Sequence, residues 1–269
     1  MAVRSPLFTV MERAARKAGR GLIRDFGEIE QLQVSVKSPG DFVSAADRHA
    51  EETLRNELAR GRPGYGFLGE EGGEAAGDGE HRWIVDPLDG TTNFLHGIPH
   101  FAISIALERA GELVAGLVYN PVADEMYWAE KGRGAFLNDR RLRVSGRRKL
   151  GECLIGTGIP FQQRGDHARY LRTLEAVMAR TAGVRRIGAA ALDLCAVAAG
   201  RFDGFWEYGL NAWDIAAGIV LIREAGGFIG AIDGRAKPLE AEGLVAANEH
   251  LQLPLARLLR DAERGRVDA

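Results

Sequence analysis

The stretch around which the fold is organised is Trp83-Ile84-Val85-Asp86-Pro87-Leu88-Asp89-Gly90-Thr91-Thr92-Asn93-Phe94. Its first residues are apolar and suit a buried strand, which ends in two aspartates separated by a proline and a leucine. A glycine and two hydroxyl residues follow at once and can open a helix. The stretch therefore predicts a strand, an irregular turn and a helix in direct succession.

The same residues predict a chemistry. Hard divalent cations such as Mg²⁺ prefer oxygen ligands, and Asp86 and Asp89 lie close enough in sequence to converge on one cation or bridge two. Pro87 fixes one backbone dihedral, which helps to aim the Leu88 carbonyl as a further ligand. If a helix begins just after Gly90, its unpaired N–H groups face the same point and suit phosphate oxygens. Cation ligands beside an anion-binding backbone indicate phosphoryl chemistry.

A purely structural interpretation is the alternative. Asp86 and Asp89 would then form an Asx turn and a helix cap, as most aspartate-rich turns do. Glu70 and Glu71 follow an apolar run at a strand end, where they are either further ligands or part of a solvated acidic loop. Asp214 precedes a helix that ends at Gly226-Gly227, so it is either a ligand or an N-cap.

Asp47 and Thr91 form a second candidate pair. The carboxylate of Asp47 could accept a hydrogen bond from the Thr91 hydroxyl, which would orient an attacking water. Asp47 fits equally well as the last residue of a capping box that begins at Ser44. The spacing alone leaves both interpretations open.

The overall composition excludes several classes of protein. The net charge of −2 gives no basic field, so nucleic acid is not the expected partner. Cys153 and Cys195 are too few and too isolated for a disulfide framework or a thiolate metal cluster, and we expect reduced core residues. Charged residues interrupt the N-terminal apolar positions, and no apolar run approaches the roughly 18 residues of a membrane span. A cytoplasmic location is therefore expected.

The apolar spacing predicts the order of elements. An amphipathic helix is expected over 7–26 and a second from Ser44 to Gly61. Short β-like runs follow at 65–68, 83–85, 101–107, 113–119 and 125–128, with a hairpin turn at 109–112, which indicates a largely antiparallel sheet. Helices are expected near 166–181, 190–199, 213–225 and 249–263. We place a boundary near Gly146, between subdomains 1–146 and 147–269.

The chain resembles the inositol monophosphatase family, which comprises Mg²⁺-dependent, lithium-sensitive phosphatases. The resemblance extends over nearly the whole chain and is carried by four blocks in order: Lys37 with 41–47, then 69–71, 83–94 and 213–227. It implies a mixed α/β fold, a layered αβαβα sandwich with an antiparallel N-terminal sheet and a mixed C-terminal sheet. It also implies a homodimer.

By position, the resemblance implies that Glu70, Asp86, Asp89 and Asp214 bind Mg²⁺ and that Leu88 adds its carbonyl oxygen. Glu70, Thr91 and Asp47 match the catalytic residues that activate the attacking water. The positions that match the substrate site are Gly90, Thr91, Thr92, Gly188, Ala189, Ala190, Glu207 and Asp214. Family members often have threonine or serine where this chain has Ala189, which puts one side-chain contact to the substrate in question. We expect Arg185 and Arg186 to be surface charges.

The sequence is compatible with several functions. Hydrolysis of inositol 1-phosphate leads, by direct in-line attack, because no cysteine, histidine or aspartate nucleophile motif is visible. The same chemistry on histidinol phosphate, a sugar bisphosphate or a 3′-phosphonucleotide is the nearest alternative. A function of another class, an accessory binding factor of the bacterial transcription machinery, follows from some bacterial relatives.

Overall fold

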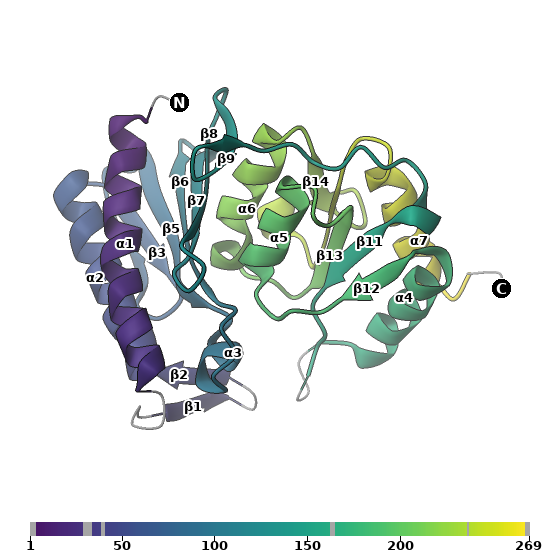
Figure 1. The fold of residues 1–269 in the computed structure, drawn as a ribbon, viewed down its shortest axis with the longest axis horizontal. Coiled ribbons are helices and arrows are strands. Elements are labelled where there is room, and N and C mark those ends of the chain that lie inside the picture. The colour runs from purple at the N-terminus through teal and green to yellow at the C-terminus, as the bar shows by residue number, and fades with distance from the viewer. Residues whose placement is uncertain (1–3, 29–33, 39–40, 162–164, 236, 267–269) are drawn as a thin grey trace.

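The computed structural model describes residues 4–28, 34–38, 41–161, 165–235 and 237–266, with the backbone alone for 34–38 and 41–44. Three helix pairs alternate with an eight-stranded and a five-stranded sheet, so that the molecule has five layers (Figure 1). The αβαβα sandwich expected from the sequence is therefore confirmed.

The first sheet has the strand order β10-β9-β8-β7-β6-β5-β3-β4. Its strands are β3 (Gly66–Gly69), β4 (Gly73–Ala75), β5 (His81–Asp89), β6 (Ala102–Arg109), β7 (Glu112–Asn120), β8 (Glu125–Glu130), β9 (Gly134–Leu137) and β10 (Arg140–Arg141). Neighbouring strands are antiparallel except β3 and β5, which run parallel. The predicted hairpin joins β6 to β7, and Ala110 and Gly111 have φ values of 50° and 78°. A two-residue hairpin turn requires this left-handed pair.

The outer face of this sheet is covered by α1 (Pro6–Gly27) and α2 (Ala45–Gly61). Side chains alternate along a strand, so Trp83 and Val85 face these helices whereas Ile84 faces the opposite layer. The Ser5 hydroxyl caps α1 by accepting from the Phe8 N–H at 2.9 Å. The capping box predicted to begin at Ser44 involves a side chain that lies outside the described residues.

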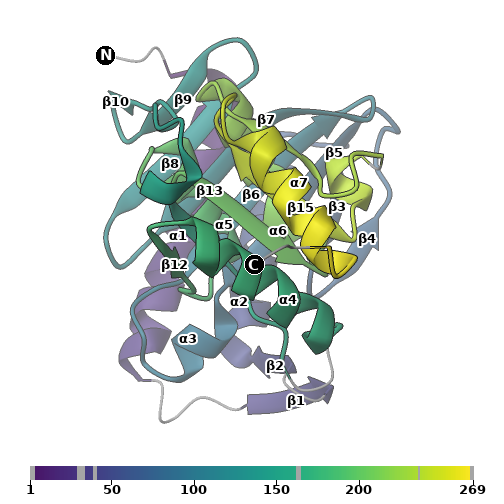
Figure 2. The ribbon, with the colours of Figure 1, turned by 90° about the vertical axis from the view of Figure 1, so that its right-hand side faces the viewer.

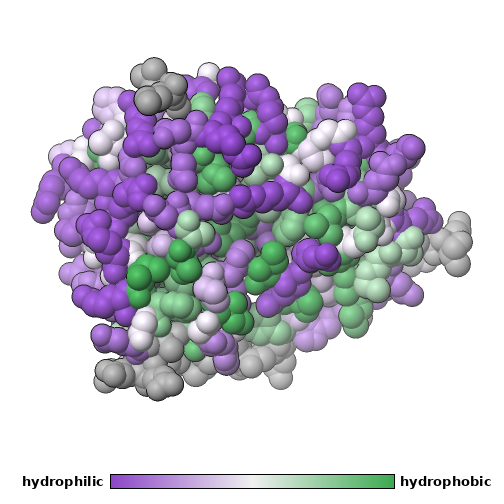
Figure 3. Space-filling view, in the orientation of Figure 1, coloured by the Kyte–Doolittle hydropathy of each residue, from purple (hydrophilic) through white to green (hydrophobic). Residues whose placement is uncertain are grey.

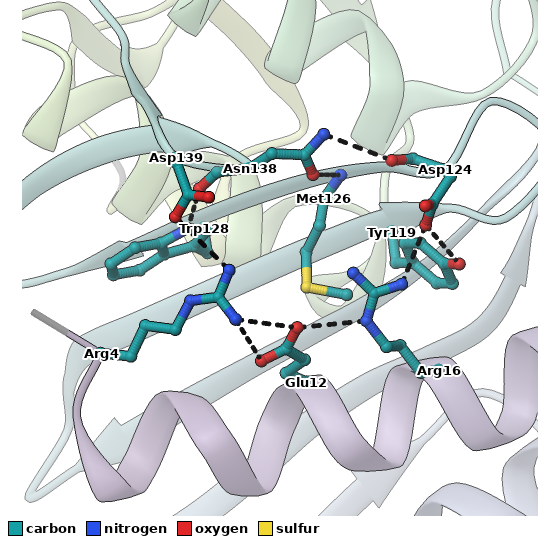
Figure 4. Close-up of polar contacts among 9 residues, drawn as sticks. All are labelled: Arg4, Glu12, Arg16, Tyr119, Asp124, Met126, Trp128, Asn138 and Asp139. Carbon is teal, nitrogen blue, oxygen red and sulfur yellow. Dashed lines mark hydrogen bonds and ion pairs between the residues drawn. The ribbon is translucent and has the colours of Figure 1, made fainter. Parts of the chain in front are cut away.

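Ion pairs also tie α1 to the loops of the first sheet (Figure 4). Glu12 pairs with Arg4 at 3.3 Å and with Arg16 at 3.1 Å on its own helix. Arg16 reaches Asp124 at 2.9 Å, and the Tyr119 hydroxyl donates to the same carboxylate at 2.9 Å. Most of these groups are partly exposed, so we assign the network a role in orienting the helix rather than a large stabilisation.

The central layer consists of α5 (Ala190–Ala198) and α6 (Ala212–Glu224), and it packs on both sheets. One hydrophobic cluster contains Ala102 and Val118 of the first sheet, Phe205 and Ala246 of the second, and the buried residues of both helices. At Gly116 a Cβ atom would lie 2.6 Å from the carbonyl oxygen of Ala217, so α6 approaches β7 closely only because this residue is glycine. The two halves of the chain thus share one core.

The second sheet has the order β12-β11-β13-β15-β14 and is mixed, because β11 runs parallel to β12 and β13 whereas β15 runs antiparallel to its neighbours. Its strands are β11 (Leu154–Thr157), β12 (Gly183–Arg185), β13 (Gly204–Tyr208), β14 (Phe228–Ala231) and β15 (Gly243–Ala247). The outermost layer, α4 (His167–Arg180) and α7 (Gln252–Glu263), lies across this sheet (Figure 2). The four helices predicted for the second half are confirmed.

Short elements complete the chain. A two-stranded sheet of β1 (Val34–Ser38) and β2 (Asp41–Ser44) was not predicted, and α3 (Thr91–Leu95) is the helix expected after Gly90. Two single 3₁₀ turns cover Leu150–Glu152 and Pro238–Glu240. Cys153 and Cys195 are free and buried, as expected. Among the described helices, none combines the length and the apolar character needed to cross a bilayer.

Candidate active site

The parallel pairing of β3 with β5 brings two predicted ligands together. Gly69 and Val85 are the last residues paired between these strands, so Glu70 and Asp86 follow this pairing side by side, and Asp86 stays in the sheet through its pairing with Ser104 of β6. Asp86 is 1% exposed. By alternation with Ile84 its side chain faces the central helix layer, where α6 begins with Asp214 in its first turn.

Local hydrogen bonds fix the turn after β5. The Leu88 N–H donates to Asp86 Oδ1 at 2.9 Å, so the Asx turn of the structural interpretation is present. The Thr91 hydroxyl donates to the Leu88 carbonyl oxygen at 2.9 Å, and its contact with Asp47 Oδ2 is longer, at 3.5 Å. Asp47 is 1% exposed. The predicted Asp47–Thr91 pair is therefore brought together, with the Leu88 carbonyl as the nearer acceptor.

Asp89 links the first half of the chain to the second. Its Oδ2 atom accepts from the Ala191 N–H at 2.8 Å, at the first turn of α5. The N-cap residue of that helix is Ala189, which has no side-chain acceptor, so Asp89 takes the place of a cap from a distant strand. The helix cap of the structural interpretation is present, but it caps the distant helix α5 rather than the helix that follows Asp89 in the sequence.

Asp214 likewise has a structural contact. It stands at the third position of α6, and its Oδ2 atom accepts from the Asn211 N–H at 2.7 Å, which completes a capping box. Both structural contacts leave carboxylate oxygens of Asp89 and Asp214 available, since a carboxylate has about four acceptor positions. The structural and functional interpretations of these aspartates therefore do not exclude each other.

The charges in this region repel one another. Burial raises the pKa of Asp86, and the negative charges of Glu70, Asp89 and Asp214 raise it further. Burial also raises the pKa values of Asp89 and Asp214, against the lowering effect of their backbone hydrogen bonds. A folded state that concentrates buried carboxylates in this way is stabilised by a bound cation.

This donor set fits an oxygen-liganded divalent cation better than a soft metal. Within the described residues, no three acidic, histidine or cysteine side chains lie close enough to hold a metal ion as they stand. The fit rests instead on the chemistry of the donors, buried carboxylates at a strand end whose mutual repulsion a hard cation would relieve.

The backbone after Asp89 has the form expected of an anion site. Gly90 has φ 91° and precedes α3, and a Cβ atom there would lie 3.0 Å from the His100 carbonyl oxygen and 3.3 Å from the Ala189 Cβ atom. Glycine is required on both counts. Thr92 lies in the first turn of α3, so its N–H is among those without a partner within the helix.

Asn93 joins this turn to the predicted substrate loop. Its side-chain amide donates to the carbonyl oxygens of His100 at 2.8 Å, Ile187 at 3.0 Å and Gly188 at 3.3 Å. Gly188 has φ 89°, a conformation that favours glycine. The three predicted substrate positions in this loop are Gly188, Ala189 and Ala190. They therefore lie against the turn after β5, and Ala189 and Ala190 are buried.

A cavity of about 840 Å³ opens beside the carboxylates. Glu70, Glu207, Asn211 and Asp214 line one part of it. Its other lining residues come from the segment after β11, from the start of α4, from the end of β13 through the start of α6 and from the segment before β15: Gly158, Ile159, Pro160, Phe161, Gly165, Asp166, Arg169, Tyr208, Gly209, Leu210, Trp213 and Glu242. The cavity therefore joins two of the predicted ligands, Glu70 and Asp214, to the predicted alcohol contact at Glu207.

Glu207 is held in a narrow space among acidic neighbours. A Cβ atom at Gly158 would lie 1.8 Å from Glu207 Oε1, so the carboxyl packs directly on this glycine. Burial raises the pKa of Glu207 well above its ordinary value, as do the charges of Asp193 and Asp214, whereas Arg186 lowers it. Arg186 is exposed, as expected of a surface charge, and its positive charge favours the ionised form of Glu207. The side chain of Arg185 donates to the neighbouring carbonyl oxygen of Val184 instead.

Three polar residues of this region were not predicted from the sequence. Asp193 is 2% exposed on an otherwise apolar helix, and its Oδ1 atom has no hydrogen-bond partner among the described residues. Asn93 and Glu51 hold loops on either side of the carboxylates. A charged residue on the apolar face of an amphipathic helix is the signal that would have identified Asp193 and Glu51.

Comparisons with known proteins identify the family of this chain. A model of the inositol monophosphatase family matches residues 4–264. An inositol-1-monophosphatase of Rhizobium meliloti is 61% identical over 258 residues, which are 96% of this chain and 97% of that protein. The Nus factor SuhB of Pseudomonas aeruginosa is 46% identical over 248 residues, 90% of this chain and 92% of that protein.

The crystal structure of the extragenic suppressor protein suhB from Bartonella henselae superposes with a TM-score of 0.92 at 56% sequence identity, covering 95% of this chain and 99% of that chain. Both the sequence match and the shared fold extend over almost the entire length. The chain therefore belongs to the inositol monophosphatase family.

Proposed function

We propose that this chain hydrolyses inositol 1-phosphate to inositol and inorganic phosphate in a Mg²⁺-dependent reaction. Its family membership makes it a phosphoric monoester hydrolase. The observation that carries the proposal is the group of carboxylates around Asp86, of which Glu70 and Asp214 line a cavity large enough for a small phosphate ester.

In the proposed site, Glu70, Asp86, Asp89 and Asp214 and the Leu88 carbonyl hold Mg²⁺. When bound, Mg²⁺ supplies positive charge that eases deprotonation of the attacking water and offsets charge on the leaving oxygen. The backbone N–H groups of Gly90, Thr91 and Thr92 bind the phosphate oxygens.

Proton transfer is assigned to residues at the start of α2 and α3. The Thr91 hydroxyl lies between the Leu88 carbonyl oxygen and Asp47, so a small rotation redirects its hydrogen bond from the first acceptor to the second. In this orientation the Thr91 oxygen accepts a hydrogen bond from the attacking water, and as the water attacks, its proton passes to Thr91 while the Thr91 proton passes to the Asp47 carboxylate. We assign Glu70 to orienting the same water.

The alcohol portion is assigned to the other end of the cavity. Glu207 lines the cavity. As a carboxylate it accepts hydrogen bonds from ring hydroxyls, and in its protonated form it can also donate one to them. Gly188, Ala189 and Ala190 contact the ring through the loop that Asn93 holds.

A panel of phosphate monoesters tests the proposal. Phosphate release from inositol 1-phosphate, histidinol phosphate, fructose 1,6-bisphosphate and a 3′-phosphonucleotide is measured with Mg²⁺, after chelation, and with Mg²⁺ restored. The highest kcat/KM is expected on inositol 1-phosphate, with loss of turnover in EDTA and recovery with Mg²⁺. A higher kcat/KM on another member of the panel would assign that substrate, and full turnover in EDTA would exclude the Mg²⁺ site.

A second function has one specific observation in its favour. The Pseudomonas aeruginosa relative is named a Nus factor, which is a name for a transcription factor rather than for a phosphatase. Binding of this chain to the transcription machinery of its own host, measured with the wild type and with a catalytically inactive Asp86→Asn variant, separates the two functions. The homodimer and the cytoplasmic location stay predictions, and light scattering on the purified protein checks the first.

A further inference from the structure

We propose that Glu51 is a positioning residue that holds the Glu70 loop in the conformation needed to bind a cation. The proposal rests on the role proposed above for Glu70. Glu51 lies on α2, one turn after Asp47, and its side chain is directed at the loop between β3 and β4.

The contact uses both carboxylate oxygens. Glu51 Oε2 accepts from the Glu71 N–H at 2.8 Å, and Oε1 accepts from the Gly72 N–H at 2.7 Å. Gly69 and Gly73 pair across the hairpin, so the loop contains only three residues. Glu51 thus binds the two N–H groups that directly follow Glu70, in an arrangement that favours an anion.

The glycines of the loop make room for this carboxylate. A Cβ atom at Gly69 would lie 2.4 Å from Glu51 Oε2, and one at Gly72 would lie 2.6 Å from Oε1. Neither glycine has a positive φ, so the backbone conformation does not require glycine at these positions. Their small size makes room for Glu51 and its neighbours, since the same Cβ atoms would lie 2.6 Å from the Phe67 ring at Gly69 and 2.6 Å from the Arg55 guanidinium at Gly72.

Burial and charge show that the contact is specific. Glu51 is 4% exposed, and a buried carboxylate is costly unless it is well hydrogen-bonded. Arg55, one turn later on α2, lies 3.6 Å from Oε1, and its guanidinium lies 4.4 Å from the centre of the Phe67 ring in β3. Arg55 therefore fixes Glu51 against the same strand that leads into Glu70.

One helix face consequently positions both sides of the proposed site. Asp47 and Glu51 are both buried and lie four residues apart, so they share a face of α2. Asp47 contacts the Thr91 hydroxyl, and Glu51 holds the loop of Glu70. Loosening Glu51 would let Glu70 move away from Asp86 without altering any proposed ligand.

Two measurements on metal-free protein test this role: amide hydrogen exchange of 71–72 and the calorimetric affinity for Mg²⁺ without substrate. Glu51→Gln replaces one acceptor oxygen by an N–H donor. We expect faster exchange at both amides and Mg²⁺ binding weakened by roughly 10–100-fold, as for other residues that orient a ligand. At saturating Mg²⁺ most of the kcat should return.

Glu57→Gln is the matched control. Glu57 lies on the same helix, is as buried as Glu51, and pairs with Lys17 at 2.8 Å and Arg13 at 3.1 Å, away from the loop. The control should lower the melting temperature and leave Mg²⁺ affinity and loop exchange unchanged. Gly72→Ala is a second test variant, because its Cβ atom displaces Glu51 while every carboxylate is retained; it should reproduce the effect of Glu51→Gln if the latter fails to fold.

The outcomes separate this proposal from the proposed function. If the wild type binds no Mg²⁺ and shows no Mg²⁺-dependent turnover, the function itself is wrong. If the wild type binds Mg²⁺ and both Glu51→Gln and Gly72→Ala bind it equally well, the positioning role is wrong and the function stands. Faster exchange with unchanged Mg²⁺ affinity also overturns the role, because the loop would then be held for stability alone.

Discussion

Asp89 in β5 and Ala191 in α5 are 102 residues apart in sequence and are joined by a hydrogen bond of 2.8 Å from the Ala191 N–H to the Asp89 carboxylate. The same carboxylate is a proposed Mg²⁺ ligand. A single side chain therefore attaches the central helix layer to the first sheet and contributes to the acidic site, and the two roles can be separated by substitution.

Asp89→Asn keeps an oxygen that can accept from Ala191 and removes the charge. Since a raised carboxyl pKa means that the charged form destabilises the folded protein at neutral pH, we expect the metal-free variant to melt at or above the wild-type temperature. Turnover should be lost, and Mg²⁺ should no longer raise the melting temperature as it does for the wild type. Asp89→Ala is the comparison variant: it should lose turnover as Asp89→Asn does and, unlike Asp89→Asn, should also have a lower melting temperature. Full turnover in Asp89→Asn would show that Asp89 acts only as a helix cap and is not a ligand.

Asp47→Asn tests the assignment of proton transfer. The Thr91 hydroxyl lies 3.5 Å from Asp47, and loss of the Asp47 carboxylate removes the proton acceptor while leaving the four proposed carboxylate ligands and the Leu88 carbonyl intact. We expect kcat to fall by about 100-fold or more, the usual contribution of general base catalysis, with nearly unchanged Mg²⁺ affinity. If stopped-assay kinetics showed an unchanged kcat and scanning calorimetry a lower melting temperature, Asp47 would be a helix-capping residue only.

Gly90→Ala tests the backbone geometry before α3. An alanine at this position must adopt φ 91°, which strains its backbone, and its methyl group must approach the His100 carbonyl oxygen to 3.0 Å, which is a close steric contact. We expect a loss of about 1–3 kcal/mol in the free energy of unfolding and a strong loss of kcat/KM. Gly111→Ala has a similar φ of 78° but open surroundings in the β6–β7 turn, so it should lose stability alone. Equal kcat/KM in both variants would show that Gly90 does not contribute to phosphate binding.

Glu207→Gln tests the recognition of the alcohol. If Glu207 binds a ring hydroxyl in its ionised form, losing that charge-assisted hydrogen bond costs on the order of 1.5–3 kcal/mol, which corresponds to a loss of roughly ten- to a hundredfold in kcat/KM on inositol 1-phosphate, and in its protonated form the cost is about 0.5–1.5 kcal/mol. An aryl phosphate without those hydroxyls should barely respond. Equal losses on both esters would assign Glu207 to the structure or to the metal site instead.

A pH dependence of stability is expected at Glu57. Its pKa is lowered below 4.5, mainly by the hydrogen bond that Lys17 donates. Because the folded pKa lies below the unfolded one, the stabilisation is present above the unfolded pKa and is lost as the pH falls through the folded value. The difference in free energy of unfolding between the wild type and Glu57→Gln should therefore be largest near neutral pH and shrink below about pH 4. A difference that does not change over this range in urea titrations would contradict the ion-pair account.

The sequence predicted local features well because they depend on residues close together in the chain. The spacing of apolar residues located the long helices, and Ala110-Gly111 marked the hairpin turn. The parallel pairing of β3 with β5 was not predicted, since β4 intervenes and each strand's pattern is the same for either direction of its partner. That pairing is what sets Glu70 beside Asp86.

Long-range contacts account for most of what sequence analysis missed at the site. Asp89 was predicted as a ligand, but its bond to Ala191 depends on how two sheets pack, as does the charge of Arg186 acting on Glu207. The buried Asp193 and the contact of Glu51 with 71–72 were overlooked because helix periodicity ranks positions by apolar residues. A polar residue at a position where the periodicity expects an apolar one indicates a specific polar contact, and a ranking by apolar residues overlooks it.

The shared core of the central layer has a consequence for biosynthesis. As the chain leaves the ribosome, the first sheet can pair its strands and take up α1 and α2, but the face that carries Ala102 and Val118 has no cover until α5 and α6 have been translated. The nascent chain therefore exposes an apolar surface for the time needed to synthesise the segment from the end of β10 to Glu224. Asp214 is synthesised as part of α6, the helix that completes the cover of this apolar surface. The last proposed ligand in the chain is therefore translated together with the segment that lowers the risk of aggregation.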